Sequence, residues 1–598
     1  MSCLLPPGRM PGRGEAGKDP DAVIELKNIS YRYPGTDFYA LKDVSLRVRR
    51  GEVLLITGPT GAGKTTLCYI LNGLVPHFFG GTFEGEARVL GYNVPETPVG
   101  FLATRVGMVF SDPLSQLVSA TVEDEVAFGL ENLGLPEEDI SKRVKRALEY
   151  VGLYDLRGRP PYTLSGGEQQ AVALASILAM EPEIYVLDEP TANLDPLGTL
   201  RILDLLKKLS REKGKTIVVV EHKLEEMAEI ADRMIVMNEG RVIAEGSPRE
   251  ILTRRAEHLH SLGLEAAHIP LLVQRLAGRG IIKSPGSIPL TLSEGVRFFD
   301  ELLSSGELSI GGRAWEPNGG SEAGGEPIIV VEDLVHVYPG GTMALKGVSM
   351  KVYRGDFLAI IGQNGSGKTT LVKHFNGLLK PTRGRVRVFG MDVEETPTSE
   401  LVKRVGYIFQ DPDRQLFTRR VRDELAFGPK NIGVPPGEIE ERIRDVSRKL
   451  RIEHLLDREP YSLGKGEKQR IAIASILVMN PEVIILDEPT TGQDPRNRRE
   501  IMDTMKMLHE EGKTIVFITH DMNLVAEYAS RCIVMSDGRI LLQGTPREVF
   551  SEVEVLRTTR LKPPTITSLF MELSKRHPIK EVILTLDEAV SLFEGGGR

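Results

Sequence analysis

The sequence predicts two α/β domains of the same kind, joined head to tail and each followed by a small appendage. The chain has 598 residues, too many for one hydrophobic core, and suits two domains of roughly 250 residues. The segment ALKDVSLRVRRGEVLLITGPTGAGKTTL at 40–67 returns as ALKGVSMKVYRGDFLAIIGQNGSGKTTL at 344–371. Within each copy, short apolar runs alternate with segments of helical spacing, which is typical of a parallel sheet covered by helices.

Matching motifs keep a nearly constant separation, which indicates that the whole domain is duplicated. The separation is 304 positions for Lys64 and Lys368, 299 for Asp188 and Asp487, and 298 for His222 and His520. In the first copy, β-rich runs bounded by Gly or Pro occupy 52–58, 183–190, 216–222 and 233–242. Helical spacing occupies 139–151, 196–212 and 223–231.

Composition shifts and the repeat set the expected domain boundaries. The stretch 288–303 resembles 582–596 in the second copy. An apolar segment precedes each of them, at 268–280 and at 566–577. Each domain therefore carries a duplicated tail, and the Gly-rich stretch between the copies predicts a flexible linker. The expected parts are a leader that is either disordered or a mis-called start (1–20), a first domain (21–255), its appendage (256–310), a linker (311–326), a second domain (327–552) and its appendage (553–598).

Charge and composition narrow the classes of function. The formal net charge is -8, so no basic footprint favours a nucleic-acid partner. Three cysteines, Cys3, Cys68 and Cys532, lack the spacing of a disulfide framework or a metal site and fit a reducing cytoplasm. The longest apolar stretches, such as 471–479, fall short of the ~20 residues that a membrane span needs. If a membrane is involved, another chain supplies it.

Two Gly-rich motifs predict phosphate binding. GPTGAGKT (58–65) and GQNGSGKT (362–369) each follow a predicted strand and precede a helix, so that backbone N–H groups can surround phosphates. Thr65 and Thr369 are expected to ligate Mg²⁺. The residues expected to bind nucleotide are Gly58, Gly61, Gly63, Lys64, Thr65 and Thr66 in the first copy and Gly362, Gly365, Gly367, Lys368, Thr369 and Thr370 in the second.

Two pairs of acidic residues end apolar strands at matching distances from these loops. Asp188 and Asp487 suit coordination around Mg²⁺, and the next residue in each copy, Glu189 or Glu488, can polarise an attacking water. Strand-end acidic pairs are usually solvated loop charges. The matching distances from a phosphate loop in both copies favour the catalytic interpretation.

Further motifs identify a resemblance to the ABC ATPase superfamily. LSGGEQQ (164–170) resembles the signature, TANLDP (191–196) and TTGQDP (490–495) resemble D-loops, and His222 and His520 occupy the switch-histidine position. The resemblance implies ATP and Mg²⁺ as cofactors, catalytic roles for Glu189, Glu488 and both histidines, and adenine stacking on Tyr33 and Tyr338. It also implies that each domain has a RecA-like α/β core, an antiparallel β subdomain and a helical subdomain.

A narrower match points to one branch of that superfamily. The segments 111–129 and 410–428 look like the DPxxQL…DEVAFG stretch of energy-coupling factor (ECF) ATPases, which energise import of B vitamins, cobalt or nickel. The resemblance implies a transmembrane scaffold subunit, a membrane substrate-binding subunit, and a peripheral position on the cytoplasmic face of the membrane. Asp112, Asp411 and Asp413 either meet basic residues of the membrane subunit or act as caps and solvated charges, and the sequence favours neither.

Superfamily members pair their ATPase domains head to tail, so each ATP lies between one phosphate loop and the other domain's signature. The linker lets the two halves of this chain pair with each other. Site one then combines the first loop with LGKGEKQR (463–470), where Gly464 replaces Ser, Lys465 replaces Gly and Gly466 remains. Ser111 replaces the Gln that reaches toward Mg²⁺ and the γ-phosphate, and Gln116 aligns with Gln415 instead.

Site two keeps the expected residues, with Glu168 at a usual Gln position as the main departure. The expected residues of the second copy are Lys368, Gln410, Asp487, Glu488 and His520, and Gln410 is expected to reach toward Mg²⁺. They face Ser165, Gly166 and Gly167 of the first signature. We therefore expect site two to carry most turnover. Site one is expected to hold nucleotide and to be slow rather than inactive, because Glu189 and His222 persist.

Three other functions fit the sequence less well than ECF-type import. A tandem ABC protein acting on ribosomes would need a basic surface or a long charged helix between domains. The fused ATPase of a sugar-type importer also has tandem halves, but the DPxxQL segments and paired tails disfavour it. A nucleotide-binding regulator is disfavoured by the two Glu/His sets. The sequence does not give the transported substrate, nor whether the tails pair within one chain or between chains.

Overall fold

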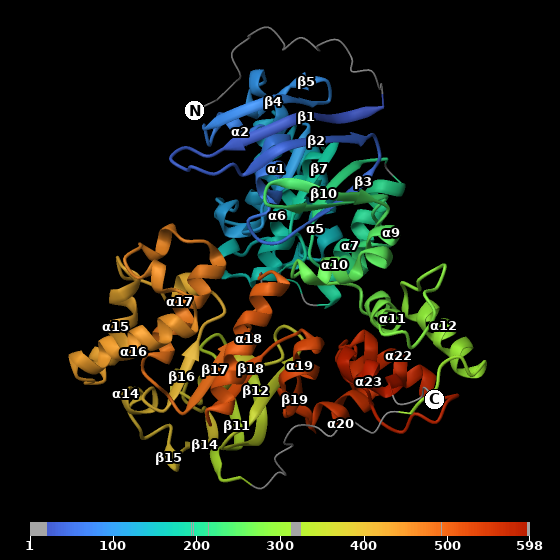
Figure 1. The fold of residues 1–598 in the computed structure, drawn as a ribbon. Coiled ribbons are helices and arrows are strands. Elements are labelled where there is room, and N and C mark those ends of the chain that lie inside the picture. Colours follow the sequence, from blue (N-terminus) through green and yellow to red (C-terminus); the bar gives the residue numbers. More distant parts are fainter. Residues whose placement is uncertain are drawn as a thin grey trace. The chain divides into compact units, whose positions relative to one another are not determined.

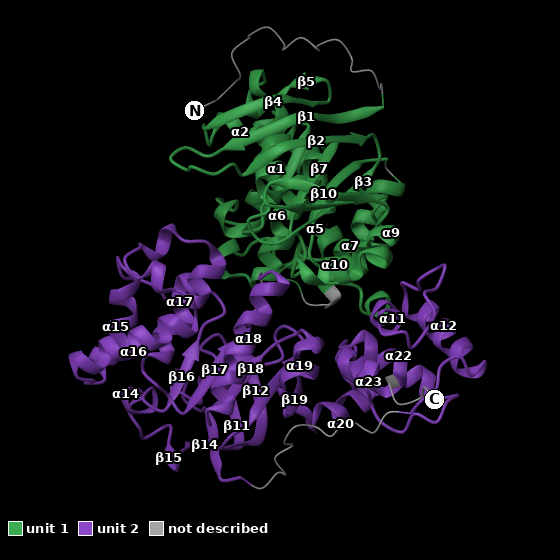
Figure 2. Ribbon diagram, in the orientation of Figure 1, with its two compact units in different colours: residues 1–271 green, residues 272–598 purple. Residues whose placement is uncertain are grey.

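The computed structural model divides the chain into two compact units, residues 1–271 and 272–598 (Figure 2). The structure describes residues 21–192, 194, 196–212, 214–311, 325–491 and 493–594. The predicted leader at 1–20 and most of the predicted linker lie outside these residues. Unit 1 contains the first repeat, and unit 2 contains the second repeat together with residues 272–311, so the division falls inside the predicted first appendage.

Unit 1 contains two sheets. The four-stranded sheet has the order β2-β1-β4-β5, with antiparallel neighbours. The six-stranded sheet has the order β10-β9-β3-β8-β7-β6, and only its β9–β10 pair is antiparallel. Their strands are β1 (Ala22–Arg32), β2 (Leu41–Arg49), β3 (Val53–Thr57), β4 (Thr82–Val89), β5 (Tyr92–Asn93), β6 (Val106–Val109), β7 (Ile184–Asp188), β8 (Thr216–Val220), β9 (Arg233–Asn238) and β10 (Arg241–Gly246).

Unit 2 repeats this arrangement. Its sheets have the orders β12-β11-β14-β15 and β16-β17-β18-β13-β19-β20, and only the β19–β20 pair of the larger sheet is antiparallel. The strands are β11 (Pro327–Val337), β12 (Met343–Tyr353), β13 (Phe357–Gly362), β14 (Arg383–Val388), β15 (Met391–Asp392), β16 (Val405–Ile408), β17 (Val483–Asp487), β18 (Thr514–Ile518), β19 (Arg531–Ser536) and β20 (Arg539–Gly544). The predicted duplicated α/β fold is confirmed.

Burial explains why the central strands read as unbroken apolar runs. Every residue of β3, β7 and β8 is buried, because helices cover both faces of a parallel sheet. The antiparallel strand β2 instead alternates buried and exposed residues, since one of its faces meets solvent. The single β-rich run predicted at 233–242 is wrong in one respect: a turn at Glu239 and Gly240 divides it into the hairpin β9–β10.

The helices follow the same repeat (Figure 1). Those up to the boundary of unit 1 are α1 (Lys64–Leu71), α2 (Leu74–His77), α3 (Val99–Ala103), α4 (Val122–Asn132), α5 (Glu137–Val151), α6 (Gly166–Met180), α7 (Pro196–Arg211), α8 (Leu224–Met227), α9 (Pro248–Arg254), α10 (Ala256–Ser261) and α11 (His268–Gly278), which crosses it. The short 3₁₀ helices of unit 1 are η1 (Val94–Glu96), η2 (Pro113–Ser115), η3 (Tyr154–Leu156) and η4 (Pro161–Thr163). Helices α4, α5 and α6 pack on one another, which gives the expected helical subdomain.

Unit 2 has corresponding helices and the two tails. They are α12 (Leu292–Ser304), α13 (Lys368–Lys373), α14 (Thr398–Leu401), α15 (Val421–Asn431), α16 (Pro436–Lys449), α17 (Lys465–Leu477), α18 (Pro495–Glu510), α19 (Met522–Tyr528), α20 (Pro546–Ser551), α21 (Val553–Thr558), α22 (Thr565–Ser574) and α23 (Leu586–Glu594). The 3₁₀ helices are η5 (Pro412–Arg414), η6 (Glu453–Leu455) and η7 (Pro460–Ser462). Among the described residues, none of the helices combines the length and the apolar character that crossing a membrane requires.

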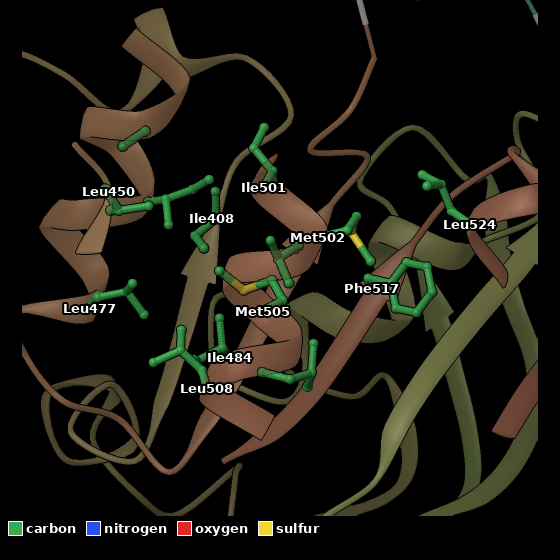
Figure 3. Close-up of a cluster of buried hydrophobic side chains, with 14 of the residues drawn as sticks. Ile408, Leu450, Leu477, Ile484, Ile501, Met502, Met505, Leu508, Phe517 and Leu524 are labelled. Carbon is green, nitrogen blue, oxygen red and sulfur yellow. The ribbon is translucent and has the colours of Figure 1, made fainter. Parts of the chain in front are cut away.

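The main core of the second domain joins its sheet to the helices beside it. Figure 3 shows Ile408 and Ile484 from neighbouring strands meeting Met502 and Met505 of α18. Leu477 of α17 extends the same cluster toward the helical subdomain. Strand β17, which ends at Asp487, and its neighbour β16 are therefore anchored by burial of their side chains.

The two tails pack against each other inside unit 2. Helix α12, from the first appendage, packs on α22 of the second. The rings of Phe299 and Phe593 stack with centroids 5.9 Å apart, and Phe570 lies 5.7 Å from Phe593. At the edge of this cluster, Asp300 accepts hydrogen bonds from Arg576 (2.6 Å) and His577 (2.8 Å). In this structure the tails therefore pair within one chain.

Candidate active sites

The phosphate loops connect β3 to α1 and β13 to α13, and both are shaped by a close backbone approach. A Cβ atom at Gly58 would lie 2.2 Å from the carbonyl oxygen of Met237, and one at Gly362 would lie 2.3 Å from that of Met535. Only glycine fits where the neighbouring strand passes this closely. The glycine at the start of each loop therefore has a structural cause.

The loop lysines are buried and folded back over their own loops. The Nζ atom of Lys64 donates to the carbonyl oxygens of Gly58 (2.7 Å) and Pro59 (2.9 Å). Lys368 repeats the contact with the carbonyl oxygen of Gly362, at 2.8 Å. Both ammonium groups are thus held at the centre of a loop that is rich in backbone N–H groups, an arrangement suited to binding phosphate.

Each loop threonine contacts the aspartate at the end of the neighbouring strand. Thr65 Oγ1 donates to Asp188 at 2.7 Å, and Thr369 Oγ1 donates to Asp487 at 3.0 Å. Burial and the neighbouring Glu189 carboxylate raise the pKa of Asp188 to about 6, and the hydrogen bond from Thr65 opposes this rise. Burial also raises the pKa of Asp487. A buried carboxylate beside a hydroxyl is a donor set that Mg²⁺ prefers, so these residues fit the predicted metal.

The two candidate catalytic glutamates have different partners. Glu189 lies 3.2 Å from His222 Nε2. Glu488 instead accepts a hydrogen bond from Gln410 Nε2 at 3.0 Å, and His520 Nδ1 is 3.9 Å away.

Both glutamates have the same backbone conformation. Their φ angles are positive, 51° at Glu189 and 47° at Glu488, a region that non-glycine residues rarely adopt. Strain of this kind gathers where a side chain must be aimed at a site.

The segment after β6 explains the difference between the glutamates. Ser111 stands where Gln410 stands in the second copy. The amide oxygen of Gln116 accepts from the backbone N–H of Phe110, just as that of Gln415 accepts from Phe409, both at 3.2 Å. The predicted alignment of Gln116 with Gln415 is thus confirmed, so Gln116 does not replace the missing glutamine.

The tyrosines predicted to stack on adenine lie beside the phosphate-loop helices. The Tyr33 hydroxyl is 3.1 Å from Thr66 Oγ1, and the Tyr338 hydroxyl is 3.0 Å from Thr370 Oγ1. Each ring is therefore held next to the start of the helix that follows the loop. Adenine stacking itself stays a prediction.

The signature segments form helix N-termini, at Ser165 before α6 and Gly464 before α17. Ser165 Oγ donates to Glu168 Oε2 at 2.7 Å, and the same carboxylate accepts from the Ser165 backbone N–H at 2.8 Å. Glu467 accepts from the Gly464 backbone N–H at 3.0 Å. The unusual acidic residue in each signature is therefore a cap for its own helix. Only the first signature offers a hydroxyl.

Sequence reasoning missed one residue of the second site. The Tyr407 hydroxyl donates to Asp487 Oδ2 at 2.6 Å. The corresponding residue of the first copy is Met108, which carries no donor. The signal was present, because the pentapeptides VGMVF (106–110) and VGYIF (405–409) differ at this position within otherwise similar runs.

Comparisons with known proteins agree with this geometry. The ABC transporter family matches residues 41–192 and 345–491. A protein of Caldanaerobacter subterraneus, provisionally named an ABC transporter ATP-binding protein, is 43% identical over 96% of this chain and 99% of its own length. A Bacillus subtilis protein, provisionally named an HMP/thiamine import ATP-binding protein, is 34% identical over 89% of this chain and 93% of its own length.

One solved structure is also similar to part of this chain in sequence. CbiO1 from Clostridium perfringens, described as part of the ABC transporter complex CbiONQ, is 43% identical and has a TM-score of 0.37. It covers 41% of this chain and 99% of its own. The family match in both copies and the extent of the relatives' similarity lead to one conclusion: the chain belongs to the ABC transporter ATP-binding family, whose members hydrolyse ATP.

Proposed function

We propose that this chain is the ATPase subunit of an ECF-type importer for a vitamin or a transition metal ion. It would act at the cytoplasmic face of the membrane, with a transmembrane scaffold subunit and a membrane substrate-binding subunit as partners. The DPxxQL segments of both copies support this assignment. The named relative from Bacillus subtilis, with its HMP/thiamine import designation, favours a vitamin-type substrate within that class.

The observation that carries the proposal is a pair of exposed apolar positions in each copy, next to the DPxxQL segment. Val118 and Phe128 of the first copy are 72% and 50% exposed, and the matching Phe417 and Phe427 are 56% and 47% exposed. The Phe417 and Phe427 rings also contact each other edge to face, 4.8 Å apart. Large apolar side chains left open at equivalent positions favour a protein partner on each copy.

The proposed cycle rests on the residues of the two phosphate loops. With ATP bound, Mg²⁺ would supply positive charge beside the phosphates, and Thr369 and Asp487 would hold it in the second copy. Glu488 would orient the attacking water, with Gln410 positioned against it. The segment after Gln410 leads directly to Phe417, so a change at the phosphates reaches the proposed partner surface through a short piece of chain.

We further propose that the halves pair head to tail and form two unequal ATP sites. Site two would combine the second loop with the first signature, where Ser165 supplies a hydroxyl. Site one would combine the first loop with the second signature, where Ser111 and Gly464 each remove a group that could contact the γ-phosphate. Site two would then carry most turnover.

The experiment that tests the assignment is purification of the full chain from detergent-solubilised membranes of its own cells. We expect two integral membrane proteins to copurify: a scaffold with basic residues in cytoplasmic segments, and a smaller substrate-binding protein. A Phe417→Ser/Phe427→Ser double variant should retain less of them, because only the first copy then keeps its exposed apolar pair. Copurification with ribosomes, or a membrane complex that recruits a soluble binding protein, would support one of the rival functions instead.

Charge reversal at Asp411 tests how the partner is recognised. The Asp411 carboxylate caps η5 by accepting from the backbone N–H of Asp413 at 3.1 Å, yet 42% of its side chain is exposed. We expect Asp411→Lys to reduce assembly with the membrane subunits about 10-fold or more, because it opposes basic partner residues. Asp411→Asn is the control, since it keeps the cap and removes the charge, and it should weaken assembly less. Assembly of Asp411→Lys at the unaltered level would show that Asp411 only caps the helix.

A further inference from the structure

The aspartate beside the second phosphate loop is held from two sides. Tyr407 lies in β16 with 4% of its surface exposed, and its hydroxyl donates to Asp487 Oδ2 at 2.6 Å. Thr369 Oγ1 donates to the other oxygen, Oδ1, at 3.0 Å. Two donors on different oxygens fix both the position and the plane of the carboxylate. Because a carboxylate has about four lone-pair sites, it can still accept further contacts.

The first copy lacks the second donor. Met108 occupies the same place in its sheet: it pairs with the residue two before Asp188, as Tyr407 pairs with the residue two before Asp487. The Met108 sulfur accepts from Asn72 Nδ2 at 2.9 Å. Thr65 donates to Asp188 Oδ2, while Oδ1 is buried and has no hydrogen-bond partner among the described residues. The two aspartates therefore differ in support, although their sequence motifs are alike.

We propose that Tyr407 is a positioning residue that orients Asp487 for the divalent cation bound with nucleotide at the second phosphate loop. The inference rests on the proposed magnesium site and deepens it. Partners behind a metal ligand keep that ligand in its binding geometry, and their loss typically costs 10–100-fold in metal affinity. The second loop therefore binds the divalent cation more tightly than the first. This asymmetry is separate from Gly464, which lies in the other copy's signature, and from Ser111, because it acts through the aspartate rather than through the residue after β6.

A purely structural role for the Tyr407 ring can be separated from this one. The ring packs edge to face on Phe409, with centroids 4.9 Å apart. Tyr407→Phe keeps that packing and removes only the hydroxyl. If the ring alone matters, Tyr407→Phe behaves like the unaltered protein in every measurement.

Mn²⁺ provides a direct probe, since its binding is read by electron paramagnetic resonance without turnover. The full chain is titrated with Mn²⁺ and a non-hydrolysable ATP analogue in a Lys64→Ala background, so that only the second loop is loaded. We expect Tyr407→Phe to weaken Mn²⁺ binding 10–100-fold while metal-free nucleotide affinity stays within about twofold. Mn²⁺ affinity within twofold of the Lys64→Ala parent overturns the role of Tyr407.

The first copy supplies the reciprocal test. The background is Lys368→Ala, so that only the first loop is loaded. Met108→Tyr then places a hydroxyl at the strand position that matches Tyr407, where it can donate to Asp188 Oδ1. This variant should tighten Mn²⁺ binding by the first loop about 10-fold. Met108→Leu is the matched control and should not. Unchanged affinity in Met108→Tyr, with the variant folded as judged by circular dichroism, counts against the inference. Absence of nucleotide-dependent Mn²⁺ binding in the Lys64→Ala parent itself would overturn the magnesium site and the inference together.

Discussion

Replacing Glu488 with Gln is expected to lower steady-state ATP hydrolysis by about 100-fold or more, whereas Glu189→Gln lowers it only a few-fold. Glu488 is hydrogen-bonded to Gln410 and lies beside an aspartate held by two donors. Glu189 instead faces His222, and its copy has no glutamine at position 111. Substitution by Gln changes charge but hardly changes volume, so the two variants compare chemistry rather than packing.

The measurement is phosphate release by the full chain at saturating Mg²⁺ and ATP. Nucleotide binding is followed in parallel, and both variants should still bind two nucleotides. Equal losses of hydrolysis would contradict the proposed inequality of the sites. A larger loss in Glu189→Gln would reverse their order, and would place most turnover at the first phosphate loop.

The second large effect is expected where the tails meet. Phe299 is fully buried and its ring stacks on Phe593. Truncation of a buried Phe to Ala typically costs about 3–5 kcal/mol, because apolar contact is lost and a cavity remains. Phe299→Ala should therefore raise the open population of the tail pair by a factor of roughly 10² to 4 × 10³.

Hydrogen exchange of the full chain measures this opening locally, which is necessary because a chain of two units need not unfold in a single step. Protection of backbone amides in α12, α22 and α23 should fall in Phe299→Ala, while that of the central strands stays unchanged. Leu292→Ala on the same helix is the control, since Leu292 is 38% exposed. If both variants exchange at the same rate, the stacked phenylalanines do not hold the tails together.

The features that the sequence predicted are those encoded by local pattern. The repeat, the buried strands before Asp188 and Asp487, and the phosphate loops follow from runs of apolar residues and from glycines at fixed spacing. The correspondence of Gln116 with Gln415 also needed only an alignment of the two copies. Chain segments of this kind carry their structural information within a few residues.

The features that escaped prediction depend on contacts between distant segments. The bond from Tyr407 to Asp487 joins two strands 80 residues apart in sequence. The difference between Met108 and Tyr407 marks the position, but it does not show which residue the tyrosine contacts. The hairpin at 233–242 was missed because β9 is buried and hides the change of direction at Glu239. To predict the pairing of the tails, one would have to know where α12 lies once the second domain has folded.

That last contact also sets an order of events during synthesis. Asp300 and His577 are 277 residues apart, and the whole second ATPase domain lies between them. At the usual 5–20 residues per second, α12 leaves the ribosome roughly 14–55 s before the segment that covers Phe299 does. During this interval the apolar face of α12 is exposed without its native partner. Because translation sets this interval, rapid folding of the second domain cannot shorten it, and the nascent chain depends on chaperones or on the low concentration of partners to keep α12 from associating elsewhere.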